Sequence, residues 1–133
     1  TLGGMDDIAA VLGHDAAQEA VRCMGVLLDR HFGGVGGFSA RRGMNEFMTV
    51  LPYSDLAEAG EMLKDFIEDF SSRGLQDISA RSLRRAASGG CVEFSILAGL
   101  AQGHPVAGID AVIEAAKAQQ KEVARLRCDA SQR

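Results

Sequence analysis

The chain has 133 residues, of which 47% are apolar and 24% charged, and this composition is typical of one globular domain with its own core. Its formal net charge of −4 argues against general affinity for nucleic acid, because the phosphate backbone attracts basic surfaces. No apolar run approaches the roughly 18 residues that a membrane-spanning helix needs, so direct membrane insertion is not expected.

The cysteines bear on the cellular location, and the first residues bear on whether the sequence is part of a longer protein. Cys23, Cys91 and Cys128 are odd in number and widely spaced, which favours reduced thiols and a cytoplasmic location. Thr1 to Gly4 does not resemble a natural start. We therefore expect residues 1–133 to be a single domain cut from a longer multidomain protein.

The first half of the chain predicts two helices and a hairpin. A short helix is expected over Asp6 to Leu12, with Asp6 as its cap, and a longer one from about Asp15 to Phe32. Strands from Phe38 to Arg41 and from Phe47 to Leu51 are separated by a turn. The longer helix has apolar residues at helical spacing that predict its buried face: Ala20, Val21, Met24, Leu27, Leu28 and Phe32.

The second half predicts a third helix that starts at Asp55, with Glu58 at the capping-box position, and ends before Gly74. Its expected buried residues are Leu56, Met62, Leu63, Phe66, Ile67 and Phe70. The segment from Leu75 to Gly90 fits either a short helix with a loop or a mobile insert.

Two further elements complete the predicted order. Val92 to Ile96 alternates and predicts a strand, and a last helix is expected from Gly108 to Leu126. The residues of that helix expected to face the core are Ile109, Val112, Ile113, Ala116, Val123 and Leu126. The order of elements indicates an α+β fold with a mainly antiparallel sheet flanked by helices.

The hairpin turn carries the most informative motif, Gly43-Met44-Asn45-Glu46-Phe47. It resembles the Gly-Gly-Asp/Glu-Glu-Phe signature of the GGDEF family, the bacterial diguanylate cyclases, at three of five positions. Gly13-His14 and the segments Val92 to Gly103 and Asp110 to Lys117 are similar to other family motifs in the same order. The resemblance implies a nucleotide-cyclase-like domain with a ferredoxin-like sheet, whose first strand would be short or absent here.

The resemblance also implies which groups the chemistry would need. A diguanylate cyclase joins two GTP molecules, and magnesium takes carboxylate and phosphate oxygens. The two magnesium carboxylates of the family fall at Thr1 and Asn45, and the two guanine contacts fall at Ala9 and Gln18. The metal carboxylates are therefore lost, and we expect neither catalytic residues, nor a metal, nor a cofactor, nor enzyme activity.

A few groups remain that could still act on a ligand. Glu46 survives beside the turn, although a solvated acid is the alternative interpretation. Lys117 and Lys121, one helical turn apart in the predicted helix, are the candidates for residual phosphate binding, with a solvated helix face as the alternative. Met44 adds bulk where the family has a second glycine, which favours an altered or filled pocket.

The sequence leads to three functional hypotheses. The first is a catalytically inactive GGDEF-like signalling or protein-interaction domain of a larger bacterial protein, whose partners are neighbouring domains or a second copy in a homodimer. The second is a regulatory domain that binds GTP or cyclic di-GMP without turnover. The third is a divergent active cyclase.

Overall fold

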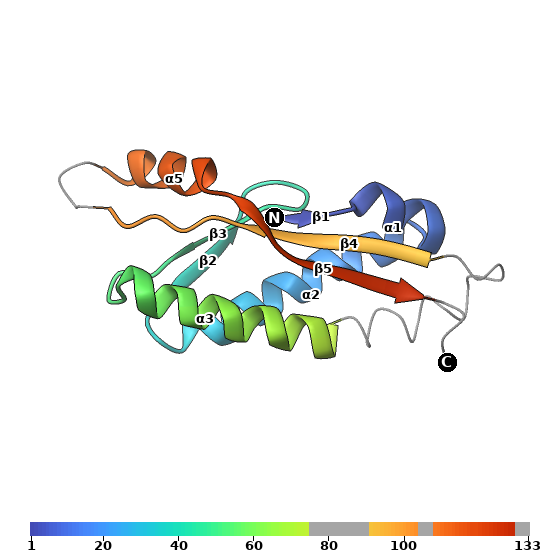
Figure 1. The fold of residues 1–133 in the computed structure, drawn as a ribbon, viewed down its shortest axis with the longest axis horizontal. Coiled ribbons are helices and arrows are strands. Elements are labelled where there is room, and N and C mark those ends of the chain that lie inside the picture. The colour runs from blue at the N-terminus through green and yellow to red at the C-terminus, as the bar shows by residue number, and fades with distance from the viewer. Residues whose placement is uncertain (75–90, 104–107, 130–133) are drawn as a thin grey trace.

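The computed structural model of the chain describes residues 1–74, 91–103 and 108–129, and its elements form an α+β fold (Figure 1). In chain order these elements are β1 (Leu2–Gly3), α1 (Met5–Leu12), α2 (His14–Gly33), β2 (Phe38–Arg41), β3 (Phe47–Val50), α3 (Leu56–Asp69), the π-helical turn η1 (Phe70–Gly74), β4 (Cys91–Ala98), α5 (Ile109–Ala118) and β5 (Lys121–Asp129). The predicted alternatives for Leu75 to Gly90 lie outside the described residues.

The helix starts were predicted with mixed success. The carboxylate of Asp55 accepts a hydrogen bond of 2.8 Å from the backbone nitrogen of Glu58, so the predicted start of α3 is confirmed. The predicted cap of α1 at Asp6 is wrong, because Gly4 occupies the cap position without a side-chain hydrogen bond. Gly4 adopts a φ of 88°, which glycine reaches without a steric penalty.

The predicted last helix is wrong in its second half. Helix α5 ends at Ala118, and the chain then forms β5, which pairs with β4 in antiparallel register from Lys121 to Asp129. From Ala124 onward apolar and polar residues alternate, which suits a strand, and β4 supplies the partner. Val123 and Leu126 fit a helical spacing as well, and this ambiguity misled the sequence-based prediction.

Every strand pair among the described residues is antiparallel, as predicted, but the strands form two sheets. One sheet has the order β1-β4-β5, and the other is the β2-β3 hairpin. The very short β1 pairs Leu2 with Ile96 of β4. The backbone nitrogen of Leu2 also donates to the Asn45 carbonyl oxygen at 2.9 Å, so β1 joins the hairpin to the larger sheet.

The core is built around α2, and the whole predicted buried face of that helix is confirmed. From α3 and η1 it receives Phe66 and Phe70, whose rings stack at 6.0 Å. Ile67 is only partly buried, and Leu56, predicted to be buried, is 45% exposed at the start of α3. Among the residues that the structure describes, the buried core cluster consists of Leu2, Ile8, Ala16, Ala17, Ala20, Val21, Met24, Leu27, Leu28, Phe32, Phe66, Phe70 and Ile96.

Helix α5 lies apart from this core, near the end of the β4-β5 ribbon that is remote from the C-terminus (Figure 1). None of its residues is fully buried, and Ile109, expected to face the core, is 56% exposed. None of the helices in the described ranges combines the length and apolar content needed to cross a bilayer. Among the described side chains, Cys23 is a half-buried thiol.

Candidate functional site: the hairpin turn and the groove beside it

The five signature residues lie at the turn between β2 and β3. Arg41 pairs with Phe47 at the end of the hairpin ladder, and the backbone nitrogen of Arg42 donates to the Glu46 carbonyl oxygen at 2.8 Å. The remaining residues of the signature form the turn itself. The structure therefore brings Gly43, Met44, Asn45, Glu46 and Phe47 together at the end of a rigid ladder, as the sequence predicted.

The side chain of Arg41 closes this turn from within. Its Nε donates to the Gly43 carbonyl oxygen at 2.8 Å, and its Nη2 donates to the Met44 carbonyl oxygen at 2.5 Å. Hydrogen bonds from a charged donor are among the stronger ones in proteins. Two nitrogen atoms of the guanidinium, Nε and Nη2, are therefore already hydrogen-bonded to the turn, and fewer N–H donors remain for a ligand.

Asn45 ties the turn to β1 through two hydrogen bonds. Its carbonyl oxygen accepts from the Leu2 nitrogen at 2.9 Å, and its side-chain Nδ2 donates to the Leu2 carbonyl oxygen at 2.7 Å. A carboxylate has no donor and would face that carbonyl with a second acceptor. The residue at the signature's carboxylate position is therefore a structural donor here, which the sequence analysis missed because the partner lies 43 residues away.

Thr1, the second position predicted for a lost carboxylate, lies beside this junction. Its amino group donates to the Leu97 carbonyl oxygen at 2.9 Å, and its Oγ1 accepts from the Gln120 side chain. Burial lowers the pKa of the Thr1 amino group, and the negative charge of Glu46 partly opposes that shift. Glu46 therefore acts electrostatically on the start of β1, in a half-buried position.

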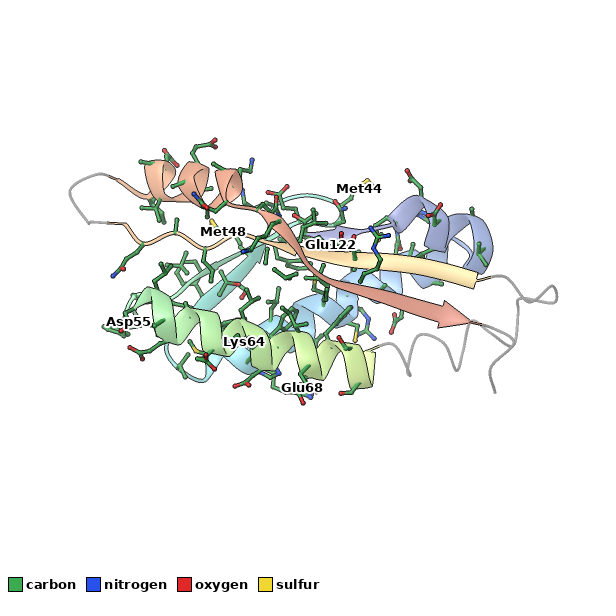
Figure 2. The ribbon with its side chains drawn as sticks, in the orientation of Figure 1. Met44, Met48, Asp55, Lys64, Glu68 and Glu122 are labelled. Atoms are coloured by element: carbon green, nitrogen blue, oxygen red, sulfur yellow. The ribbon has the colours of Figure 1, made fainter. Side chains whose placement is uncertain are left out.

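Met44 does not fill a pocket, so of the two expected outcomes, an altered or a filled pocket, the filled pocket is wrong. Its side chain is 70% exposed at the tip of the turn and points away from the body of the domain (Figure 2). The extra bulk relative to glycine is accommodated in solvent.

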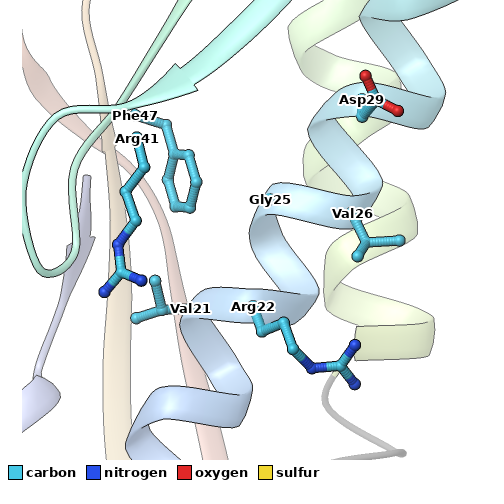
Figure 3. Close-up of a pocket in the computed structure, with 7 residues that line it drawn as sticks. All are labelled: Val21, Arg22, Gly25, Val26, Asp29, Arg41 and Phe47. Carbon is cyan, nitrogen blue, oxygen red and sulfur yellow. The ribbon is translucent and has the colours of Figure 1, made fainter.

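A groove of about 390 Å³ lies between the hairpin and α2, beside the place where the two are in contact (Figure 3). Gly25 allows the Phe47 ring to pack on the helix, because a Cβ at this position would lie 3.1 Å from its Cε1 atom. Arg22 points away from Arg41 and pairs with Glu19 at 2.5 Å. The residues that line the groove are Val21, Arg22, Gly25, Val26, Asp29, Arg41 and Phe47.

The remaining predicted positions lie outside this groove. Ala9 is on α1, and the exposed Gln18 contacts the His14 ring at 3.1 Å. Lys117 lies in the last turn of α5, and Lys121 is the first residue of β5. The prediction that the two lysines lie one turn apart on the same helix is therefore wrong. Gln120 brings the junction between them next to Thr1.

Within the described ranges, no group of three or more histidine, cysteine, aspartate or glutamate side chains could hold a metal ion. The chain matches no family model, no curated protein and no solved structure. Its likeness to the diguanylate cyclases therefore stays a prediction, and any function rests on the geometry of the turn and the groove.

Proposed function

We propose that the chain is a catalytically silent GGDEF-like domain that acts as a signalling or protein-interaction module of a larger bacterial protein in the cytoplasm. The order of the described elements from β1 to β4 supports this proposal. If α1 and α2 count as one helical unit, the order is β-α-β-β-α-β, as in ferredoxin-like domains. The hydrogen bonds of Leu2 to Asn45 lie on one side of β1, and the hydrogen bonds between Thr1 and Leu97 join β4 on the other side.

The observation that carries the absence of catalysis is the hydrogen bond from Asn45 Nδ2 to the Leu2 carbonyl oxygen. Magnesium is held by oxygen ligands, usually including one or two carboxylates. At the carboxylate position implied by the resemblance, this chain presents an N–H donor that is already bound to its own backbone. The second position is Thr1, whose hydroxyl is bound to Gln120.

The energetic cost of these replacements supports the same conclusion. Removing one group that stabilises charge in a transition state typically costs about 2.7–4 kcal/mol. Both magnesium carboxylates and the guanine contact at Ala9 are replaced by residues that cannot do the same work. Cyclase turnover should therefore be undetectable.

Incubation of the chain with GTP and either magnesium or manganese tests this proposal. We expect no cyclic di-GMP above a protein-free control, while an active diguanylate cyclase in the same buffer gives product. Product formation that scales with the concentration of this chain contradicts the proposal and favours the third hypothesis, a divergent active cyclase.

A regulatory nucleotide-binding domain is the second candidate, and the groove beside the hairpin is the observation that favours it. Its volume of about 390 Å³ falls in the range of small-molecule sites. However, Arg22 and Arg41 point apart, and each is bound to a partner of its own. Thermal unfolding with GTP and with cyclic di-GMP separates the two candidates, because only the second predicts a saturable rise in the unfolding temperature.

A further inference from the structure

A second groove, of about 520 Å³, lies where the hairpin strands lead into α3, and we call it the Tyr53 groove. Its residues are Val35 from the loop after α2, Tyr53 and Ser54 from the β3-α3 connection, and Ala57, Glu58, Glu61 and Met62 from α3. It shares no residue with the groove beside the hairpin turn.

Large apolar side chains are exposed at this groove. Tyr53 is 85% exposed and Val35 is 49% exposed. Phe38 and Leu56, on the segments next to the groove, are 54% and 45% exposed. Exposed aromatic side chains that cluster with aliphatic ones are typical of binding surfaces, because single exposed residues need no explanation but a group does.

The backbone supports the Tyr53 ring in its exposed position. Gly36 has a φ of 81°, and a Cβ there would lie 3.3 Å from Cδ2 of Tyr53. The ring therefore rests on the loop backbone at Gly36 while most of its surface stays in contact with solvent. A tyrosine has only two side-chain dihedral angles to fix, so it loses little conformational entropy on binding and makes a good anchor for a partner.

The charge around the groove has one sign. Glu58 and Glu61 line it, and no lysine or arginine is among its lining residues. Asp65 and Glu68 are both exposed and extend the acidic face along α3, on which Figure 2 labels Glu68. The single base of α3 is Lys64, which bonds to Glu61 at 3.3 Å with both side chains about three-quarters exposed. Lys64 balances one of the four acidic charges of Glu58, Glu61, Asp65 and Glu68, so this face of α3 keeps a net negative charge.

The acids at the start of α3 have a structural explanation, but those further along do not. Asp55 caps the helix, and Glu58 lies in its first turn, where the helix dipole favours negative charge. Glu61, Asp65 and Glu68 lie beyond the first turn, where the dipole no longer stabilises them. The helix dipole therefore does not explain why these three exposed residues are all acidic.

We propose that the Tyr53 groove binds a basic, apolar segment of a partner protein. An apolar side chain of the partner packs against Tyr53 and Val35, and flanking lysines or arginines face Glu58 and Glu61. A second copy of this chain fits less well, because a symmetric dimer would bring two acidic α3 faces together. The inference goes beyond the proposed function and does not depend on the fate of the hairpin turn.

The test uses the full chain and three fluorescent synthetic peptides. The first peptide carries leucine and phenylalanine flanked by arginines, the second has glutamates for the arginines, and the third has serines for the apolar residues. Fluorescence anisotropy should show saturable binding of the first peptide, weakened by salt, and binding at least about tenfold weaker for the other two. Equal binding of all three peptides, or no saturable binding of the first, overturns the proposal.

Variants then locate the site. Tyr53→Ser should weaken the first peptide by about tenfold or more, as loss of an anchoring aromatic residue does. The double variant Glu58→Gln, Glu61→Gln should weaken it and flatten its salt dependence. The controls Met44→Ser, an exposed apolar residue at the turn, and Glu114→Gln, an exposed acid of α5, should leave affinity unchanged. Binding unaffected by Tyr53→Ser, or sedimentation showing a dimer that Tyr53→Ser dissociates, overturns the proposal.

Discussion

Gly99, directly after β4, allows the end of that strand to lie against the C-terminal end of α5. A Cβ at Gly99 would overlap the Ala116 carbonyl oxygen and lie 2.7 Å from the Gln120 backbone nitrogen. Only glycine lets the strand end pass this close to the last turn of α5. The position of α5, which has no fully buried residue, depends on this contact.

Gly99→Ala should therefore destabilise the domain by about 1–3 kcal/mol, as overpacking does. Urea unfolding measures the loss, and hydrogen exchange should show it concentrated in α5. The matched control is Gly60→Ala in α3, where a Cβ meets nothing within 4 Å and alanine should stabilise by about 0.5–1 kcal/mol. Equal stability of Gly99→Ala and wild type would mean that α5 does not sit on the strand end.

Phe66 is the large side chain of α3 that is buried in the core. Phe66 is 2% exposed, and its ring lies 6.3 Å from that of Phe32 on α2. The ring also meets the edge of His31 at 6.1 Å.

Phe66→Ala should cost about 3–5 kcal/mol in free energy of unfolding, because it leaves a cavity between α2 and α3. Denaturant unfolding gives the value. Leu56→Ala, on the exposed first turn of the same helix, should stay within about 0.5 kcal/mol of wild type. A loss below about 1 kcal/mol for Phe66→Ala would contradict the packing of α3 on α2.

A hydrogen bond between a histidine and a carboxylate joins the C-terminal ends of the same two helices. His31 Nε2 lies 2.7 Å from Asp69 Oδ2, with side chains 22% and 17% exposed. A double-mutant cycle with His31→Ala and Asp69→Ala should give a coupling energy between about 0.5 and 3 kcal/mol. The exposed pair Lys64 and Glu61 serves as the control, with an expected coupling of about 0.3–0.5 kcal/mol. Equal coupling for both pairs would show that burial adds nothing at His31.

Elements with a strong local signal could be predicted, and those that depend on distant partners could not. The buried residues of α2 recur at helical spacing, and Asp55 caps the start of α3. Both features depend on residues close in the sequence, so both could be predicted. The residues of β5 fit both the alternation of a strand and the spacing of a helix, so pairing with β4 decides between the two. The role of Asn45 depends on Leu2, and a two-residue strand such as β1 carries no periodicity.

At the scale of the whole molecule, the two ends of the hairpin differ in character. The turn is closed by its own residues, since Arg41 holds its carbonyls and Asn45 bonds it to β1. The opposite end opens onto the Tyr53 groove, whose apolar side chains are exposed. The hydrogen bonds of the turn and the exposed apolar side chains at the other end together favour the proposed role in protein interaction.

The stability of Asn45→Asp with and without magnesium tests the central claim most directly. We expect the variant to lose about 1–3 kcal/mol at neutral pH, because the carboxylate cannot donate to the Leu2 carbonyl oxygen. A neutral carboxyl can donate, so folding raises the pKa of the new group. The loss should then be smallest below its unfolded pKa of about 3.9 and grow as the pH rises through the folded pKa. Magnesium should not restore stability. If Asn45→Asp matches wild type at neutral pH, the hydrogen bond to Leu2 does not stabilise the turn, which contradicts the account. If magnesium raises the stability of the variant above that of wild type, the turn can form a metal site, which contradicts it as well.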